Sequence, residues 1–163
     1  MTFRQFGPGD AEFCFRVRSA AFIIKFYGEL SSQEVAAAVN CYMPSDYDKM
    51  AEEQKVFLCE ENGQRLGFFI LKRHDHSTAE MPLLYFDLKH LNKGLGCITM
   101  KYAEEWIKTN WKEVTALLVD TVIPKYNGGF YKKMGFTFNG HVSFEFNGLK
   151  VKAVRFSKQL DAN

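Results

Sequence analysis

Residues 83–97 read LLYFDLKHLNKGLGC, and this stretch decides which fold we expect. Its first part is a run of large apolar residues, which is typical of a buried strand. A polar loop follows and leads to Gly94 and Gly96, after which apolar side chains recur at helical spacing as far as Lys108. The stretch therefore predicts a strand, a glycine-containing turn and an amphipathic helix in succession.

Gly94 and Gly96 stand where this helix begins. Glycines there leave successive backbone N–H groups open, and the helix dipole adds partial positive charge, so the turn suits a phosphate or pyrophosphate. The pair lacks both the spacing of a dinucleotide-binding GxGxxG motif and the GK[ST] of a P-loop. A flexible strand-to-helix turn without a ligand is therefore the alternative interpretation.

A second informative stretch, YNGGFYKKMGF, covers residues 126–136. It predicts a short helix over 126–134 that contains an aromatic pair and stops at Gly135, a residue suited to the left-handed conformation. Tyr131 lies in this helix, and a phenol with an ordinary pKa of about 10 is a usable proton donor to a thiolate or alkoxide. A core aromatic ring with its hydroxyl at the surface is the alternative.

Local signals place the remaining elements. Asn-Gly at residues 62–63 and again at 147–148 separates strand-like runs, which predicts two tight hairpins. Asp10 is placed to cap a first helix, and Ser31 with Glu34 forms a capping-box pattern that opens a second.

These signals predict strands at residues 2–6, 55–60, 65–71, 80–88, 114–119, 136–146 and 149–156. They predict helices at 11–22, from 31 through 39, as a further turn after 43–46, at 94–108 and at 126–134. Such an order favours a mixed sheet with helices packed on its faces, in the α+β or α/β class.

Composition limits the function classes. The chain has 163 residues, 47% of them hydrophobic, and a formal net charge of +2 with scattered basic residues, so we expect one domain over residues 1–163 and no nucleic-acid partner. The cysteines lack CxxC spacing, which favours free thiols in a reducing compartment. No segment approaches the roughly 20 apolar residues of a membrane span, and the N-terminus has no apolar signal region. We therefore expect a cytoplasmic protein that does not bind membranes.

The two informative stretches, together with the preceding strand-helix-helix block and hairpin, resemble the GNAT superfamily of acetyl-coenzyme A-dependent N-acetyltransferases. The family signature Gln/Arg-x-x-Gly-x-Gly/Ala falls on residues 91–96, where both glycines match and Leu91 replaces the usual polar first residue. The segment Phe130–Phe136 matches well. An Asn often stands seven residues before the family's tyrosine, and Pro124 occupies that position here.

The resemblance implies an α+β fold, layered as helix, sheet and helix, with a mixed, mostly antiparallel central sheet. It implies that the strand at 80–88 contains a bulge and splays from its neighbour. The pantetheine arm of acetyl-CoA would pair with the backbone near Phe86 and Leu88, like an added strand. The pyrophosphate would bind the N–H groups of Asn92, Lys93, Gly94, Leu95, Gly96 and Cys97, and Lys93 would add a charge contact.

The resemblance also implies catalytic roles. Tyr131 matches the residue that commonly protonates the leaving thiolate, and a backbone N–H near Phe86 would polarise the thioester carbonyl. Glu80 falls where some members have a glutamate base, which acts directly or through water on the attacking amine. The alternatives are a base supplied by water or a carbonyl group, with Glu80 as an exposed carboxylate.

The acceptor is expected to be a primary amine of a small molecule or of a protein. The segment 22–48 offers aromatic rings and carboxylates that would suit an amine or polyamine, or else form an ordinary solvated surface: Tyr27, Glu29, Tyr42, Asp46, Tyr47 and Asp48. No metal is expected, because His74, Asp75 and His76 have no evident further ligand. A homodimer through the last hairpin or a strand edge is a further expectation. An acyl-CoA-binding sensor with little catalysis and an enzyme for another acyl group are the alternative functions.

Overall fold

The computed structural model describes residues 1–123 and 127–160. In chain order its elements are β1 (Thr2–Gln5), α1 (Ala11–Phe26), α2 (Ser32–Asn40), α3 (Pro44–Glu53), β2 (Lys55–Glu61), β3 (Gln64–Arg73), β4 (Thr78–Phe86), a 3₁₀ turn (Leu88–His90), α4 (Leu95–Asn110), β5 (Ala116–Val122), α5 (Gly128–Lys133), β6 (Thr137–Phe146) and β7 (Leu149–Gln159).

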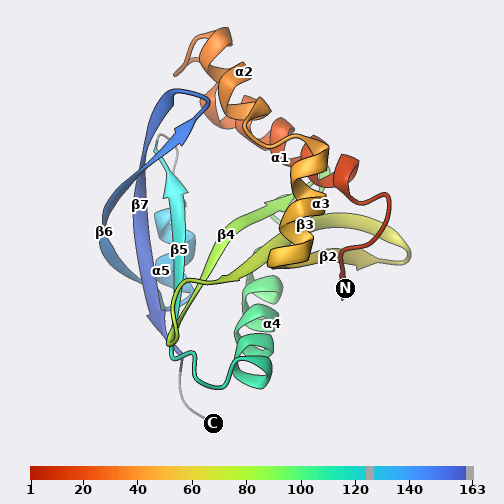
Figure 1. Cartoon of the computed structure of the whole chain (residues 1–163), viewed down its shortest axis with the longest axis vertical. Coiled ribbons are helices and arrows are strands. Elements are labelled where there is room, and N and C mark those ends of the chain that lie inside the picture. The colour runs from red at the N-terminus through yellow and green to blue at the C-terminus, as the bar shows by residue number, and fades with distance from the viewer. Residues whose placement is uncertain (124–126, 161–163) are drawn as a thin grey trace.

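One sheet of seven strands forms the centre of the molecule, in the order β1-β2-β3-β4-β5-β7-β6 (Figure 1). Only β4 and β5 pair in parallel, and every other neighbouring pair is antiparallel. The parallel pair needs a long crossover connection, which α4 supplies. The fold is therefore the mixed, mostly antiparallel α+β arrangement that we expected.

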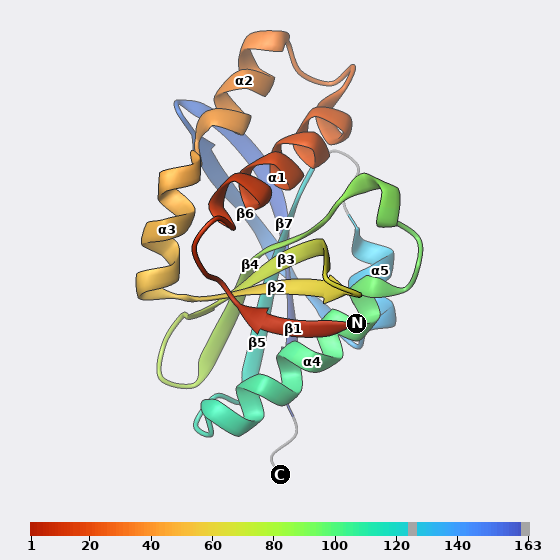
Figure 2. The same ribbon diagram turned by 90° about the vertical axis from the view of Figure 1, so that its right-hand side faces the viewer.

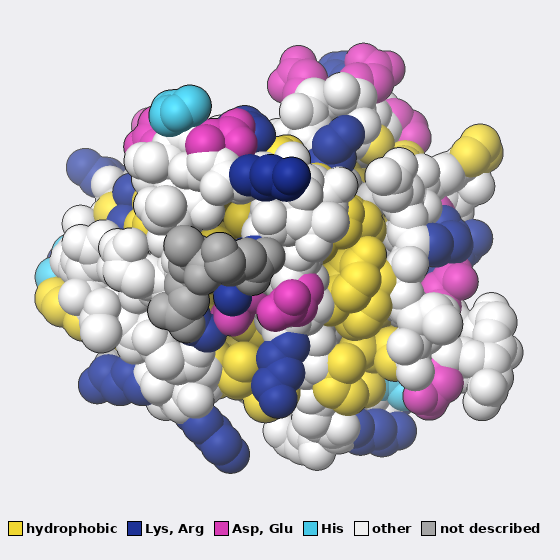
Figure 3. Space-filling view, turned by 90° about the horizontal axis from the view of Figure 1, so that it is seen from below, with side chains coloured by type: hydrophobic (Ala, Val, Ile, Leu, Met, Phe, Trp, Pro, Cys, Tyr) yellow, Lys and Arg dark blue, Asp and Glu magenta, His cyan; other side chains and the backbone are white. Residues whose placement is uncertain are grey.

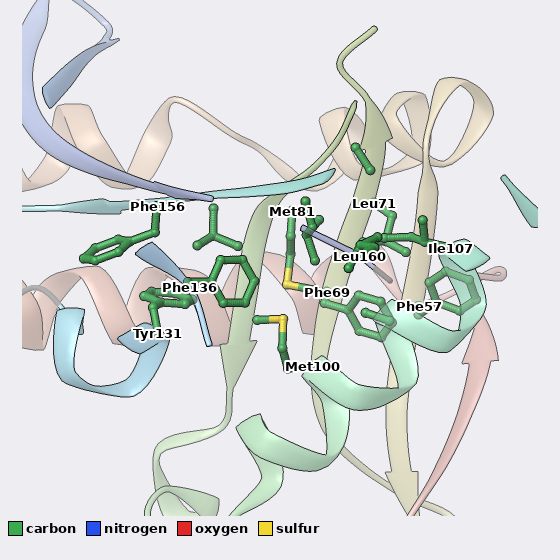
Figure 4. Close-up of a cluster of buried hydrophobic side chains, with 14 of the residues drawn as sticks. Phe57, Phe69, Leu71, Met81, Met100, Ile107, Tyr131, Phe136, Phe156 and Leu160 are labelled. Carbon is green, nitrogen blue, oxygen red and sulfur yellow. The ribbon is translucent and has the colours of Figure 1, made fainter. Parts of the chain in front are cut away.

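Helices cover both faces of the sheet (Figure 2). The helices α4 and α5 pack on one face, where Met100, Ala103 and Ile107 join the large apolar cluster shown in Figure 4. The helices α1 and α3 pack on the other face, and α2 joins α1 over the β7 end of the sheet. Burying an apolar face of each element in this way supplies most of the stability of such a domain.

The hairpin, capping-box and glycine-stop signals in the sequence are confirmed. Asn62 and Asn147 have φ of 50° and 49°, and the glycine after each is also in the left-handed region, as a tight hairpin requires. Ser31 and Glu34 form the expected capping box, in which each side chain accepts from the other residue's N–H. Gly135, which follows the C-cap residue Met134 of α5, has φ of 86°.

Several expectations about element ends were wrong: the strands predicted at 114–119 and 149–156 span 116–122 and 149–159, and three further differences have an identifiable cause. The fourth strand stops at Phe86 and not at Leu88, because the Asp87 carboxylate accepts from the N–H of Lys89 and turns the chain into a 3₁₀ turn. The first helix runs to Phe26 and not to Phe22, because Phe26 is fully buried against the sheet.

The segment after Met43 is also longer than expected. It is a helix of ten residues, with Pro44 at its first position and Asp46 accepting from the N–H of Met43 at 2.8 Å. The last predicted helix begins at Gly128 within the described residues, and its expected first residue, Tyr126, lies outside them, as does Pro124.

Asp10 does not cap α1 with its side chain. Its buried carboxylate instead accepts two hydrogen bonds from Arg4, at 2.6 and 3.0 Å, and one from the N–H of Gly7 at 2.9 Å. The Nε of Arg65 lies 3.1 Å from the same carboxylate. This ion cluster links β1, β3 and the start of α1.

On the face seen in Figure 3, side chains of both charge signs are interspersed around a band of apolar side chains. Within the described ranges, no helix is long and apolar enough to cross a membrane.

Candidate active site

The parallel strands β4 and β5 separate part-way along their length (Figure 1). Their pairing runs from Thr78 opposite Ala116 to Met81 opposite Val119. Beyond that point β5 continues to pair with β7, while β4 keeps only β3 as a partner within the described residues. The result is an opening between β4 and β5, which is the splay that the resemblance implied.

A bulge in β4 accompanies the opening. Ile70 of β3 pairs with Leu83 of β4, and Lys72 pairs with Glu80. These two pairs are two residues apart along β3 but three residues apart along β4, so β4 contains one extra residue. Side chains two residues apart normally share a face of a strand, but Met81 packs in the cluster below α4 and Leu83 packs against α1 and α3. The bulge therefore reverses which residues of β4 face each side of the sheet beyond it.

A cavity of about 140 Å³ lies at this opening. Five elements and two connecting segments line it: Arg18, Phe22 and Lys25 of α1, Tyr42 after α2, residues 80–85 of β4, Asp120, Thr121 and Val122 of β5, Asn127 before α5 and Tyr131 of α5, and Phe144 and Phe146 of β6. The cavity brings together the two predicted catalytic residues, Tyr131 and Glu80, which come from elements far apart in the sequence.

The ring of Tyr131 is held by other aromatic rings. It lies 5.8 Å from Phe136 and 5.7 Å from Phe156, measured between ring centroids (Figure 4). Its hydroxyl has no hydrogen-bond partner among the residues that the structure describes. Burial raises the pKa of Tyr131, and the nearby Tyr85 and Asp120 raise it further. The phenol therefore keeps its proton at neutral pH and is available as a donor to a group in the cavity.

Glu80 projects from β4 beside the start of the opening and is nearly buried. Its carboxylate lies 3.8 Å from Nζ of Lys72 and 3.5 Å from Nδ1 of His74. Glu80 is thus not the exposed strand-end carboxylate of the alternative interpretation. It is a cavity-lining acceptor with basic neighbours at its outer side.

Asp120 lies on the opposite strand of the opening. Its buried carboxylate accepts two hydrogen bonds from Arg155 on β7, at 2.9 and 2.7 Å. A bidentate pair of this kind neutralises the carboxylate and fixes its orientation. Asp120 therefore already has a cationic partner from the protein itself.

The helix α1 gives the cavity a cationic wall. Arg18 is only 1% exposed, and its guanidinium lies over the rings of Phe22 and Tyr42, at 4.2 and 4.8 Å from their centroids. Lys25 lies two turns further on, with its Nζ 3.5 Å from Oγ1 of Thr121. Burial lowers the pKa of Lys25 to about 8.

The predicted phosphate-binding turn lies at the start of α4. Asn92 and Gly94 have φ of 60° and 76°, so the chain makes a left-handed turn before the helix begins. The N–H of Cys97 donates to the carbonyl of Gly94 at 3.1 Å, which closes the first helical turn. Within the described chain, the N–H groups of Gly94, Leu95 and Gly96 have no such acceptor.

Gly96 also joins this turn to the cavity. A Cβ placed at Gly96 would lie 3.1 Å from Cζ of Phe130, which is the residue before Tyr131 on α5. The glycine thus lets the start of α4 pack closely against the helix that contains the predicted proton donor. The turn and Tyr131 are neighbours, although the predicted turn residues do not line the cavity.

Of the other predicted residues, Phe86 is nearly buried and pairs with Gly67 of β3 at the end of the bulged strand, and Leu88 begins the 3₁₀ turn. Among the six candidate acceptor-binding residues, only Tyr42 lines the cavity. Tyr47 is fully buried in the core, and Tyr27, Glu29 and Asp48 are exposed.

Sequence reasoning missed Arg18 and Lys25. A signal for them existed, because Arg18, Phe22 and Lys25 are spaced by four and three residues and so share one side of a helix. Because the predicted helix ended at Phe22, Lys25 lay outside it and this spacing could not be applied to it. In the described part of the chain no group of three or more His, Cys, Asp or Glu side chains is placed to hold a metal ion.

Comparison with known families gives one match. Residues 52–138 match the family model described as an acetyltransferase (GNAT) domain. This range covers more than half of the chain and includes the bulged strand, the glycine turn and Tyr131. A comparison with curated proteins finds no match.

Solved structures show the same fold over nearly the whole chain. A GCN5-related N-acetyltransferase from Rhodopseudomonas palustris is 17% identical, with a TM-score of 0.82 over 98% of this chain and 95% of its own. The PaiA N-acetyltransferase from Thermoplasma acidophilum, solved with coenzyme A, is 17% identical, with a TM-score of 0.75 over 97% and 98%. A GNAT family acetyltransferase from Elizabethkingia anophelis with acetyl-CoA bound is 16% identical, with a TM-score of 0.65 over 98% and 97%.

Proposed function

Because the chain belongs to the GNAT acetyltransferase family and is an acyltransferase, we propose that it transfers the acetyl group of acetyl-CoA to a primary amine by direct attack in a ternary complex. The observation that supports this most strongly is the cavity at the β4–β5 opening, which Tyr131 and Glu80 line together. Two of the solved neighbours contain coenzyme A or acetyl-CoA, which supports the choice of donor.

The groups present fit the two ends of such a donor. The N–H groups of Gly94, Leu95 and Gly96 are open at the start of α4, where the helix dipole favours an anionic pyrophosphate. The side of β4 that faces the opening has no strand partner beyond Met81 within the described residues, so its backbone is available to a pantetheine arm. We assign Phe86, Leu88 and residues 92–97 to this donor site.

Glu80 and Tyr131 would move the protons of the reaction. An amine must be neutral to attack, so Glu80 takes a proton from the bound ammonium, directly or through a water. The amine nitrogen then forms a C–N bond with the acetyl carbonyl carbon as the C–S bond breaks. Tyr131 donates its proton to the leaving sulfur, and the second proton of the amine nitrogen passes through water to the Tyr131 phenolate, because Glu80 already holds the first. A backbone N–H near Phe86 would stabilise the negative charge on the carbonyl oxygen.

Thermal unfolding with and without acetyl-CoA, beside NAD and ATP, tests the donor site. A ligand present at 100 times its Kd adds about 2.7 kcal/mol of stability, which a melting experiment resolves. We expect acetyl-CoA alone to raise Tm, and an amine panel read out by thiol release to show turnover. No shift at millimolar acetyl-CoA would overturn the donor site. A shift without turnover on any amine would favour an acyl-CoA sensor.

A further inference from the structure

The cavity wall formed by α1 contains two cations that the proposed chemistry does not use. Arg18 and Lys25 are seven residues apart, so they lie on one side of the helix with Phe22 between them. All three line the cavity at the β4–β5 opening. This wall therefore faces the place where the acceptor must bind.

Arg18 is a buried cation with an incomplete set of partners. Its guanidinium donates to the carbonyl oxygens of Val39 and Ala38, at 3.2 and 3.1 Å, and to Sγ of Cys41 at 3.1 Å. These bonds tie α1 to the end of α2, but all three acceptors are neutral. The Nε–H of Arg18 has no partner, and no carboxylate of the described residues forms an ion pair with the guanidinium. A buried charge without a counter-ion is costly, which indicates that an anion completes this site.

Lys25 is similarly uncompensated. Within the described ranges, the one hydrogen bond of its ammonium group goes to the hydroxyl of Thr121, at a long 3.5 Å, and no carboxylate lies within ion-pair distance of it. The cavity does contain two carboxylates, but Asp120 is neutralised by Arg155 and Glu80 has Lys72 and His74 beside it. The cations of the α1 wall can therefore pair with an anionic group of a bound ligand.

The two walls of the cavity are complementary to a zwitterion. Glu80 on β4 would receive the ammonium group that must lose a proton, and Lys25 and Arg18 on α1 would receive an anion. Cation binding by carboxylates in the segment 22–48, which we expected for a polyamine, has little support, since only Tyr42 from that set reaches the cavity.

We propose that the acceptor is a small amine that also contains a carboxylate, such as an amino acid, and that Lys25 and Arg18 bind this carboxylate. The proposal rests on the proposed acetyl transfer and specifies its substrate class. Lys25 and Arg18 are then specificity-determining residues of the acceptor site.

The test compares acceptors that differ only in the carboxylate. The α-, β- and γ-amino acids of one side-chain series are assayed beside their carboxamides and beside spermidine, with thiol release as readout. Charge-assisted hydrogen bonds are roughly twice as strong as neutral ones, so we expect kcat/KM for at least one acid to exceed that for its carboxamide about 10-fold or more. Equal values across the series, or a preference for the carboxamides or spermidine, would overturn the proposal.

Variants assign the preference to the α1 wall. Lys25→Gln should bring the acid-to-carboxamide ratio close to one, whereas Lys25→Arg should keep it. Lys49→Gln, an exposed lysine on α3, is the matched control and should leave it unchanged. Arg18→Gln removes contacts to α2 and can unfold the protein, so the Lys25 pair decides the outcome. An unchanged ratio in Lys25→Gln would overturn the assignment.

A binding measurement separates this proposal from the proposed function. Titration of the N-acetylated amino acids and their carboxamides into the CoA-loaded protein needs no turnover. Tighter binding of the carboxylate forms, lost in Lys25→Gln, would support the anion site even if no amine in the panel were acetylated. Equal binding of both forms would overturn the anion site while leaving acetyl transfer intact.

Discussion

At the scale of single residues, the site contains one buried donor without a partner. The Nε of Arg18 is buried and has no hydrogen-bond partner in the described chain, although buried polar groups are usually satisfied. By contrast, the buried carboxylates of Asp10 and Asp120 are fully paired with arginines. An unpaired buried donor costs stability, and a ligand that accepts a hydrogen bond from Arg18 in the cavity would remove this cost.

Replacing Tyr131 with Phe should separate proton donation from packing. The ring contacts with Phe136 and Phe156 remain, so the fold and coenzyme A binding should be retained. Loss of a positioned proton donor should lower kcat by about 100-fold or more. Steady-state kinetics beside calorimetric titration of coenzyme A measure the two effects. If binding is lost while turnover per bound complex is unchanged, Tyr131 is structural.

Replacing Glu80 with Gln should shift the pH dependence of acetylation. Gln keeps the shape of the side chain but cannot accept a proton from the ammonium, so the variant should need a higher pH to reach the same fraction of its maximal rate. The pH–rate profile of kcat/KM measures this, with Glu113→Gln on the surface as the control. An unchanged profile would remove Glu80 from the mechanism.

At the scale of elements, the end of β4 lies in close contact with β3. Gly67 of β3 pairs with Phe86 at the end of the bulged strand. A Cβ at this position would overlap the carbonyl oxygen of Tyr85 and lie 2.9 Å from Cα of Phe86. The clash is with backbone and cannot be relieved by a side-chain rotation. Glycine at position 67 therefore lets β4 approach β3 while its other side stays open to β5.

Gly67→Ala should consequently destabilise the protein and distort the donor site. We expect a loss of about 1–3 kcal/mol in the free energy of unfolding, as in other overpacked sites, together with weaker coenzyme A binding. Urea denaturation and titration measure these effects. Gly7→Ala is the control, because a Cβ there meets only Oδ2 of Asp10, at 4.0 Å. Wild-type stability and affinity in Gly67→Ala would refute this account of the β4 end.

At the scale of the whole molecule, Asp10 joins elements from the beginning and middle of the chain. Burial raises the pKa of this carboxyl, but the hydrogen bonds from Arg4 and Gly7 and the charges of Arg4 and Arg65 outweigh burial, and the pKa is lowered below its ordinary value. A carboxyl with a lowered pKa stabilises the folded state when ionised. That stabilisation is fully present above about pH 4, the pKa of an unfolded Asp, and is lost as pH falls through the lower folded pKa.

Asp10→Asn should therefore lower the free energy of unfolding at pH 7 by about 1–3 kcal/mol, the cost of leaving charged donors without their acceptor. It should also make stability less sensitive to pH below 4, since the group that titrates there is gone. Thermal melts across pH 2.5–7 test both effects, with the exposed Asp48→Asn as control. A variant that keeps the wild-type acid profile would contradict the assignment.

Much of the architecture is readable along the chain because its signals are local. The Asn-Gly hairpins, the Ser31–Glu34 capping box and the left-handed Gly135 depend on the backbone preferences of a few neighbouring residues, and the structure confirms each of them. The glycine turn before α4 and the segment around Tyr131 likewise identify the family from short motifs.

The acceptor side of the site could not be read in this way. The bulge that re-aims β4 arises from its pairing with β3, and α1 reaches Lys25 because Phe26 is buried in a cluster with Phe146, which is distant in sequence. Asp10 binds arginines of two strands instead of capping its own helix. These features depend on contacts between distant segments, which form only once the sheet has assembled, so local propensity determines the elements and long-range packing determines which side chains face the cavity.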